Sequence, residues 1–154
     1  NQAKEVTSID ISKQALRLAI VNVNLNNFTG NHKTIAGDAF KILRDFISKK
    51  RKFDVVIIDP PSFAKNINEI KIAKKKYKEL ALLGAKLVSI KGLLVLASCS
   101  SRILANEFLA INKEVLDKYS RNYLIIKTTQ HDVDHPINFR EGAYLKTGYY
   151  RFLD

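Results

Sequence analysis

The sequence predicts a doubly wound α/β fold, with a mostly parallel sheet between helices and an antiparallel hairpin at its C-terminal end. Short β-prone segments alternate along the chain with longer stretches of helical periodicity, which is the pattern of right-handed βαβ crossovers. Residues 53–59 and 93–97 have the unbroken apolar runs typical of parallel strands covered on both faces. A length of 154 residues suits one compact domain.

The first third of the chain contains two strand–helix units. Residues 5–10 are β-prone, and Ser12 can cap the helix that follows them. Residues 33–37 form the second expected strand, and Asp38 can cap the second helix. The apolar positions at helical spacing are Leu16, Ala19, Ile20 and Val23 in the first helix, and Phe40, Leu43, Phe46 and Ile47 in the second.

A buried strand and a long helix come next. Residues 53–59 form the strand, and Pro60 with Pro61 ends it, because proline cannot donate a backbone hydrogen bond to a sheet. A long helix is expected over residues 68–90, and Gly92 would break it. The chain therefore continues the alternation of strand and helix.

The C-terminal third adds one more strand–helix unit and two closing strands. Residues 93–97 form the next buried strand, and a helix is expected over residues 102–118. Residues 123–128 and 144–153 look like strands without a helix between them. We therefore expect an antiparallel hairpin to close the sheet.

Composition excludes several classes of protein. The apolar fraction of 46% and the charged fraction of 27% are ordinary for a globular domain, so neither disorder nor a fibrous repeat is expected. The apolar runs are far shorter than the about 20 residues that a membrane helix needs. A single cysteine allows no internal disulfide, which fits a reducing compartment such as the cytoplasm. Because the chain has no methionine and no Gly-x-Gly turn, we interpret it as a fragment whose natural beginning lies upstream.

The charge favours a polyanionic partner. Twenty-six lysines and arginines stand against 15 acids, for a net charge of +11. Such a surplus indicates nucleic acid first, and the alternative is a generic basic cytosolic domain. Lysines at helical spacing in the expected long helix could form a phosphate-binding ridge, or only a solvated face. They are Lys71, Lys74, Lys75 and Lys78, with Lys65 and Lys76 beside them.

Polar residues follow four of the expected strands directly. Asp10, Asp38, Asp59 and Cys99 occupy these positions. Ligands bind outside the carboxyl ends of strands in open α/β sheets, so four polar ends on one rim indicate a site, although a single acid there is often only a helix cap. An acid after the second strand of such a fold typically binds ribose hydroxyls, a role that suits Asp10. Asp38 could then reach the adenine edge.

Residues 59–63, Asp-Pro-Pro-Ser-Phe, are the most specific motif. The two prolines fix the backbone and free the strand-end carbonyl from sheet pairing. Phe63 could stack on a flat base. The alternative is a stiff turn that merely ends a strand.

Cys99 lies at the tip of the neighbouring expected strand, before a helix that Ser100 or Ser101 could cap. The partial positive charge of a helix N-terminus stabilises a thiolate. Because adjacent strands lie about 4.8 Å apart, Asp59 and Cys99 could face one pocket. The alternative is a small, buried and inert cysteine.

Residues 131–136, His-Asp-Val-Asp-His-Pro, have two histidines four apart. That spacing suits a metal site on a helix, but Val133 and Pro136 disfavour a helix, so we expect a loop over the active-site rim and no metal. Arg140, Glu141 and Lys146 follow closely and could touch substrate.

These motifs, in this order, resemble the catalytic domain of class I S-adenosylmethionine-dependent methyltransferases. More narrowly, the chain is similar to the bacterial 23S ribosomal RNA cytosine-C5 methyltransferases with an N-terminal PUA domain, from about residue 4 to 153. The residues that carry the resemblance are Ile9-Asp10-Ile11-Ser12, Gly37-Asp38-Ala39-Phe40, Asp59-Pro60-Pro61-Ser62-Phe63-Ala64-Lys65, Tyr77-Lys78-Glu79-Leu80, Ser98-Cys99-Ser100 and Asp134-His135-Pro136.

The resemblance implies a Rossmann-like sheet of seven strands with an antiparallel last hairpin, and a role for each site residue. Cys99 would be the nucleophile that adds to carbon 6 of cytosine, and Asp59 would lie by the methyl donor and target base. It implies contact with S-adenosylmethionine for Asp10, Ile11, Asp38, Ala39, Asp59 and Pro60. Together with the charge pattern, it implies contact with RNA, most naturally ribosomal RNA, for Pro61, Ser62, Phe63, Lys65, Lys71, Lys74, Lys75, Lys78, His135 and Arg140.

The chain departs from the family in three respects. The family's first strand and glycine-rich cofactor loop would lie upstream of Asn1, so we expect this chain alone to bind cofactor poorly and to aggregate. Pro60 and Pro61 stand where many relatives carry a second cysteine, so product release would use another base, such as water. A closely related group methylates guanine and lacks the cysteine, so the presence of Cys99 disfavours membership of that group. Two alternatives stay open: methylation of another base or of protein with Cys99 inert, and a non-catalytic RNA-binding module.

Overall fold

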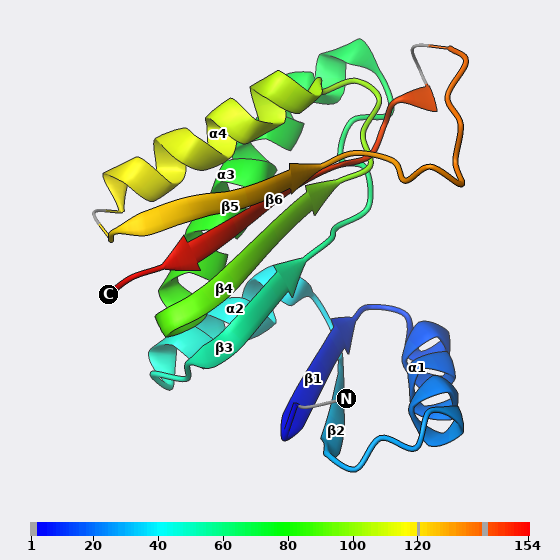
Figure 1. Cartoon of the computed structure of the whole chain (residues 1–154), viewed down its shortest axis with the longest axis vertical. Helices are drawn as coiled ribbons and strands as arrows, with labels where there is room; N and C mark the ends of the chain where they lie inside the picture. Colours follow the sequence, from blue (N-terminus) through cyan, green and yellow to red (C-terminus); the bar gives the residue numbers. More distant parts are fainter. Residues whose placement is uncertain (1–2, 120, 140–141) are drawn as a thin grey trace. The chain divides into compact units, whose positions relative to one another are not determined.

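A computed structural model of the chain describes residues 3–119, 121–139 and 142–154 (Figure 1). The chain divides into two compact units, Asn1–Asp45 and Phe46–Asp154. Each unit has its own sheet, so each is described by itself. Within the described residues, no helix is both long and apolar enough to cross a membrane.

The first unit is a strand–helix–strand with a two-stranded parallel sheet. It consists of β1 (Glu5–Asp10), α1 (Lys13–Leu25) and β2 (Asn31–Ala36). The helix α2 (Ala39–Ser48) follows, and the division between the units falls within it. The expected caps are confirmed: Ala15 N donates to Ser12 Oγ at 3.2 Å, and Lys41 N donates to Asp38 Oδ1 at 3.0 Å.

The second unit has a four-stranded sheet in the order β3–β4–β6–β5. β3 and β4 are parallel, and β6 runs antiparallel to both of its neighbours, which confirms the predicted antiparallel C-terminal pair. Figure 1 shows α3 and α4 together on one side of this sheet. The bounds are β3 (Phe53–Ile58), α3 (Ile70–Leu87) after a short 3₁₀ turn (Ile67–Glu69), β4 (Val88–Ser98), α4 (Ala105–Lys118), β5 (Tyr123–Thr129) and β6 (Lys146–Phe152).

The core of the second unit lies between its sheet and these two helices. Leu94, Tyr150 and Phe152 are fully buried on the helix-covered face. Phe108 of α4 packs edge-on against Tyr77 of α3, with ring centroids 5.2 Å apart. The core therefore fastens the strands whose ends carry the candidate site.

The boundary between the long helix and the next strand differs from the prediction. The helix ends at Leu87 and β4 begins at Val88, so Gly92 lies inside a strand and breaks no helix. The pairing of β3 with β4 shifts there, and a Cβ at position 92 would lie 2.9 Å from Ser89 O and 3.0 Å from Asp54 O. Glycine is needed because the two backbones approach closely at this irregularity.

The helix after Cys99 also starts later than predicted. It begins at Ala105 with Leu104 as its N-cap, so neither Ser100 nor Ser101 caps it. Ser100 is instead fully buried, and its carbonyl accepts a hydrogen bond from the Lys146 ammonium. The helix N-terminus therefore does not lie directly after Cys99, and the predicted capping by Ser100 or Ser101 is wrong.

The prediction that residues 53–59 are covered on both faces is wrong for this unit. Val56 and Ile58 are buried on the side of α3, whereas Val55 and Ile57 are 53% and 68% exposed on the opposite side. β1 and β3 each pair with a neighbour along one edge only. The described residues therefore form two separate sheets.

Candidate active site

In the first unit, two carboxylates stand at one edge of the parallel sheet. Asp10 pairs with Ala36 and its carbonyl accepts from Gly37 N at 3.0 Å, so both strands end together. Asp10 Oδ1 accepts from Ser12 N at 2.7 Å, and Asp38 Oδ1 caps α2. Both side chains are exposed, and a carboxylate accepts about four hydrogen bonds, so each keeps room for further donors.

Apolar surface accompanies these carboxylates. Ile11 is 80% exposed directly after Asp10, and Ala39 is exposed directly after Asp38. Carboxylates for ribose hydroxyls or an adenine amino group, beside apolar surface for a flat ring, suit a nucleoside. The residues present therefore fit the adenosine part of S-adenosylmethionine.

In the second unit, the Asp59 motif and Cys99 meet at the carboxyl ends of β3 and β4. Ile58 pairs with Leu96, so both strands end at the same edge. The Cys99 thiol donates weakly to the Pro60 carbonyl, with 3.9 Å between Sγ and oxygen. This contact brings the turn after β3 and the end of β4 together. Asp59 is exposed and Cys99 is half-buried, so both are accessible from solvent.

Hydrogen bonds fix the backbone on either side of Cys99. The Ser98 hydroxyl donates to the Tyr77 hydroxyl at 2.9 Å, and Ser100 N donates to Ser98 Oγ at 3.3 Å. Burial raises the pKa of Tyr77; the Ser98 bond opposes this change, and the nearby Cys99 and Asp59 add to it. Tyr77 is therefore a neutral phenol, and it holds the strand end in place.

Lys146 is the functional candidate that sequence analysis underrated. It is 1% exposed, and its ammonium donates to the carbonyls of Ser100 and of Tyr144, the latter at 3.0 Å. Burial lowers the pKa of Lys146 to about 8, although Cys99 and Glu107 oppose the change. A signal was present in the sequence, because strand alternation places Lys146 on the same face as the buried Tyr150 and Phe152.

Phe63 has partners within the protein. Its ring lies 5.1 Å from the Tyr77 ring, and Lys76 Nζ lies 4.9 Å from its centroid. The turn around it is tied locally: Ser62 Oγ donates to Ala64 O, and Lys65 N donates to Glu69 Oε2. Pro61 and Lys65 are exposed, whereas Ser62 and Phe63 are half-buried, so the outer part of this turn can meet a substrate.

The lysines of α3 fall into two groups. Lys74 forms an ion pair with Glu107, and Lys78 lies 2.7 Å from Glu114, so both join α3 to α4. Lys71 and Lys75 are exposed and have no carboxylate partner among the described residues.

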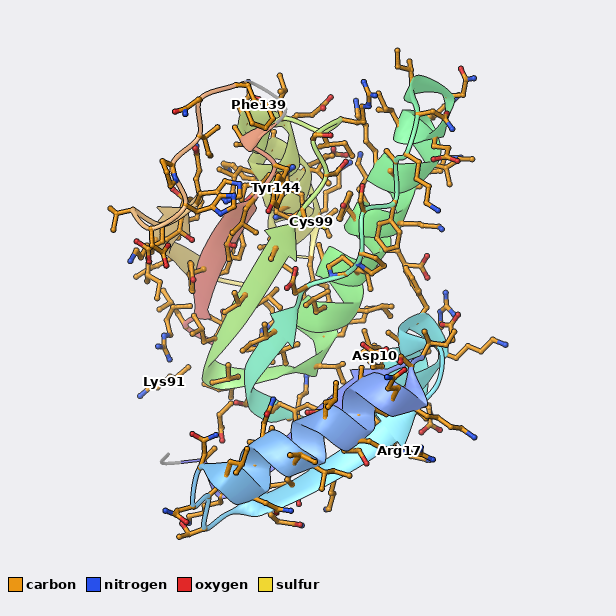
Figure 2. The ribbon with its side chains drawn as sticks, turned by 90° about the vertical axis from the view of Figure 1, so that its right-hand side faces the viewer. Asp10, Arg17, Lys91, Cys99, Phe139 and Tyr144 are labelled. Atoms are coloured by element: carbon orange, nitrogen blue, oxygen red, sulfur yellow. The ribbon has the colours of Figure 1, made fainter. Side chains whose placement is uncertain are left out.

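The two histidines of the predicted rim loop stack on each other. The rings of His131 and His135 lie 4.6 Å apart at 17°, and Tyr144 packs edge-on against His131. Leu145 N donates to His131 Nε2 at 3.0 Å. The segment is irregular, as expected, and Figure 2 shows Tyr144 beside Cys99. Arg140 lies outside the described residues, so the structure says nothing of its predicted role.

Comparison with known proteins gives consistent matches. Residues 1–147 match a family described as a methyltransferase domain. A Methanocaldococcus jannaschii protein, whose name assigns it provisionally to the ribosomal RNA large subunit methyltransferases, is 41% identical over 143 residues, which are 92% of this chain and 37% of that protein. The ribosomal RNA large subunit methyltransferase I of Aeromonas hydrophila is 35% identical over 94% of this chain and 37% of its own length.

A solved structure shares the fold. A provisionally assigned methyltransferase crystallised with SAH superimposes with a TM-score of 0.79 at 24% identity, over 97% of this chain and 39% of that one. The chain thus spans about two fifths of the length of each of these proteins.

Proposed function

The chain belongs to the methyltransferase domain family, in its class I S-adenosylmethionine-dependent group, and we propose that it methylates carbon 5 of a cytosine in large-subunit ribosomal RNA. The observation that carries the proposal is the position of Cys99, at the open end of β4 and in contact with the Pro60 carbonyl. The names of the two relatives support the ribosomal RNA substrate. The net charge of +11 supports a polyanionic partner.

Carbon 5 of cytosine is a weak nucleophile, and Cys99 would overcome this weakness. S-adenosylmethionine supplies an electrophilic methyl group when it is bound. The Cys99 thiolate forms a bond to carbon 6, and the electron pair of the C5–C6 double bond moves onto carbon 5, which then takes the methyl group. Loss of the carbon 5 proton to a base returns the electron pair to the ring and breaks the bond to sulfur, which leaves as thiolate.

The remaining roles are assigned to both units. Asp10 and Asp38, with Ile11 and Ala39 beside them, bind the adenosine part of the cofactor. Asp59 and Pro60 lie next to Cys99, where the methyl group and the target base must meet. No second cysteine exists in the chain, so water is the proposed base for the carbon 5 proton.

RNA would be held by side chains around this strand end. Pro61, Ser62, Phe63 and Lys65 belong to the turn after β3, and His135 to the loop before β6. The ridge on α3 is led by Lys71 and Lys75, because Lys74 and Lys78 already pair with acids of α4. Contacts of this kind position the substrate while Cys99 performs the chemistry.

The test is a covalent trap. The protein, in a form as long as the relatives that it matches, is mixed with S-adenosylmethionine and ribosomal RNA that contains 5-fluorocytosine, whose carbon 5 bears fluorine and cannot lose a proton. The expected result is a protein–RNA adduct on a denaturing gel, absent in Cys99→Ala and in unsubstituted RNA. Lys113→Met, a change on the exposed side of α4, is the control and should form the adduct normally.

Other outcomes would redirect the assignment. Methyl transfer that survives Cys99→Ala, without any adduct, would make Cys99 structural and the target another base or a protein. Salt-sensitive RNA binding without cofactor binding would instead indicate a non-catalytic RNA-binding module. Either result would overturn the cytosine mechanism.

A further inference from the structure

Lys146 is the most deeply buried cation at the candidate active site. Its side chain is 1% exposed at the start of β6, where it pairs with Ser98, the residue before Cys99. Its ammonium donates to the carbonyl of Ser100, the residue after Cys99, and to that of Tyr144. Lys146 therefore contacts the backbone next to the cysteine and crosses from one strand to the other.

A buried ammonium is costly unless something compensates it. Transfer of an unpaired charge out of water costs several kcal/mol, so buried cations normally face a carboxylate. Lys146 has two carbonyl partners and, among the described residues, no carboxylate within ion-pair distance. Two peptide dipoles satisfy two of its three N–H groups and leave its net charge uncompensated.

Cys99 is the nearby group that can supply a negative charge. Cys99 acts to raise the pKa of Lys146, which means that the two side chains interact electrostatically. The Lys146 ammonium also donates to the carbonyl of the residue after Cys99, which places it next to the cysteine. The ammonium bridges the carbonyls of Ser100 and Tyr144, so it lies between the residue after Cys99 and the segment before β6.

We propose that Lys146 is a positioning residue for Cys99: it fixes the backbone after the cysteine and provides the positive charge against which the sulfur becomes anionic. This role rests on the proposed function of Cys99 as a nucleophile. The helix α4 begins six residues after Cys99, so its N-terminus does not directly follow the cysteine. The requirement is physical, since only the thiolate attacks carbon 6.

Other charged and titratable groups lie on the elements around Cys99 and Lys146. Asp59 at the end of β3 is exposed, and Tyr77 of α3 is a neutral phenol in contact with Ser98. Glu107 of α4 acts on Lys146 but is itself paired with Lys74. Among these groups Lys146 is the only buried cation, so its removal should leave Cys99 with mainly negative neighbours.

The test measures the reactivity of Cys99 directly. The chain has one cysteine, so its alkylation by iodoacetamide reports on Cys99 alone. We expect Lys146→Met to alkylate about threefold to tenfold more slowly than the wild type at pH 7. The ratio of the two rates should fall toward one between pH 8 and pH 10, as Lys146 of the wild type loses its proton. If Lys146 only maintained the structure, Lys146→Met would change the alkylation rate by the same factor at every pH.

Two controls accompany this variant. Lys113→Met removes one exposed lysine from α4 and should leave the alkylation rate unchanged. Lys146→Gln replaces the ammonium with a neutral hydrogen-bond donor, and it should behave like Lys146→Met if charge is the cause. Thermal unfolding of each variant checks that the strand end is still formed.

A second measurement needs no variant. The ¹³Cε chemical shift of Lys146 is followed against pH before and after Cys99 is capped with neutral carbamidomethyl. Capping removes the anionic sulfur, so the pKa of Lys146 should fall below about 8. An unchanged titration curve, or alkylation rates that do not depend on Lys146, would overturn the inference.

The two proposals can fail separately. An adduct that needs Cys99, with reactivity that ignores Lys146, would leave the cytosine mechanism in place and remove the role of the lysine. If Lys146→Met slows alkylation but methylation survives Cys99→Ala, the interaction between Lys146 and Cys99 stands. The nucleophilic role of Cys99 is then wrong.

Discussion

A single buried lysine contacts the backbone of the strand end that carries Cys99. Lys146 lies on the core side of β6, on the face that also contributes Tyr150 and Phe152 to the core. An apolar residue there would pack at lower cost, because burial of an ammonium opposes folding. We infer that the lysine is placed there for function, and its effect on stability should be measurable.

The stability of the chain should carry the signature of Lys146 at alkaline pH. Burial lowers the pKa of Lys146 from 10.5 to about 8, so the unfolded chain binds this proton more tightly than the folded chain. The unfavourable free energy of burying the Lys146 ammonium is fully present below pH 8 and disappears as pH rises toward 10.5. The free energy of unfolding should therefore rise by about 3 kcal/mol across this window, relative to Lys146→Met.

Urea denaturation of wild type and Lys146→Met at half-unit pH steps checks this expectation. Tyrosines and the other lysines titrate in both proteins, so their contributions cancel in the difference. If the free energy of unfolding changes with pH in the same way in both proteins, Lys146 is exposed to solvent in solution and the prediction is wrong.

The site residues differed in how far the sequence could predict them. Asp10, Asp38, Asp59 and Cys99 could be named because strand ends are readable from apolar runs and their polar successors. Strand alternation indicates the buried face for Lys146, but its contact with the Ser100 carbonyl depends on the long-range pairing with Ser98. The contact between Phe63 and Tyr77 could not be predicted either, because it depends on the packing of α3 beside the turn that carries Phe63.

At the scale of the element, α3 combines a structural face with a basic one. Lys74 links it to α4 through Glu107, and Lys78 links it through Glu114. Hydrogen bonds from Lys118 and Lys78 lower the pKa of Glu114 to about 2. The exposed Lys71 lies outside these ion pairs. Only part of the lysine ridge predicted from spacing is therefore available to an RNA phosphate.

Lys71 and Lys75 should account for the phosphate contacts of α3. Each lysine that neutralises a phosphate adds about 0.7 to 0.9 to the slope of log affinity against log salt concentration. The double substitution Lys71→Gln and Lys75→Gln should therefore lower that slope by about 1.5. Fluorescence anisotropy with a ribosomal RNA fragment, at salt concentrations from 50 to 300 mM, measures it.

A charge-matched control separates a local ridge from net charge. Lys113→Gln with Lys118→Gln also removes two charges, but from α4, where both lysines pair with acids of the same helix. The control should change the slope by less than half as much. If both double substitutions lower the slope equally, only net charge matters, and the lysines of α3 face solvent without contacting RNA phosphates.

Element boundaries were predictable where local chemistry sets them. β1 and the N-terminal caps of α1 and α2 came out as expected, because Ser12 and Asp38 bond their own helices. The starts of β4 and α4 differ from the prediction. Gly92 is required by close approach to β3, and the residues after Cys99 are held by Lys146, so distant parts of the chain decided both boundaries.

At the scale of the whole molecule, the two units differ sharply in how much they bury. Of residues 3–45 only Leu16 and Leu43 are buried, whereas the second unit has a continuous core from β3 to β6. On α1, Leu18 and Leu25 are 59% and 75% exposed. This apolar surface is consistent with the expectation that the chain tends to aggregate.

Backbone amides of β1 and β2 should exchange with solvent much faster than those of β4 and β6. A two-stranded sheet with little buried apolar surface is marginal in water, and local opening there needs less free energy than opening of the core. Hydrogen–deuterium exchange with peptide-level mass spectrometry measures both sheets in one experiment. We expect at least a hundredfold difference in rate, equivalent to about 2.7 kcal/mol in opening free energy.

The comparison has an internal reference, because β4 and β6 belong to the same molecule under the same conditions. Exchange in β3 should lie between the two extremes, since it pairs along one edge and leaves Val55 and Ile57 exposed. Equal protection of β1 and β4 would contradict the prediction. It would mean that the exposed face of α1 is covered in solution, and that Asp10 and Asp38 stand on a sheet as firmly held as the one that carries Cys99.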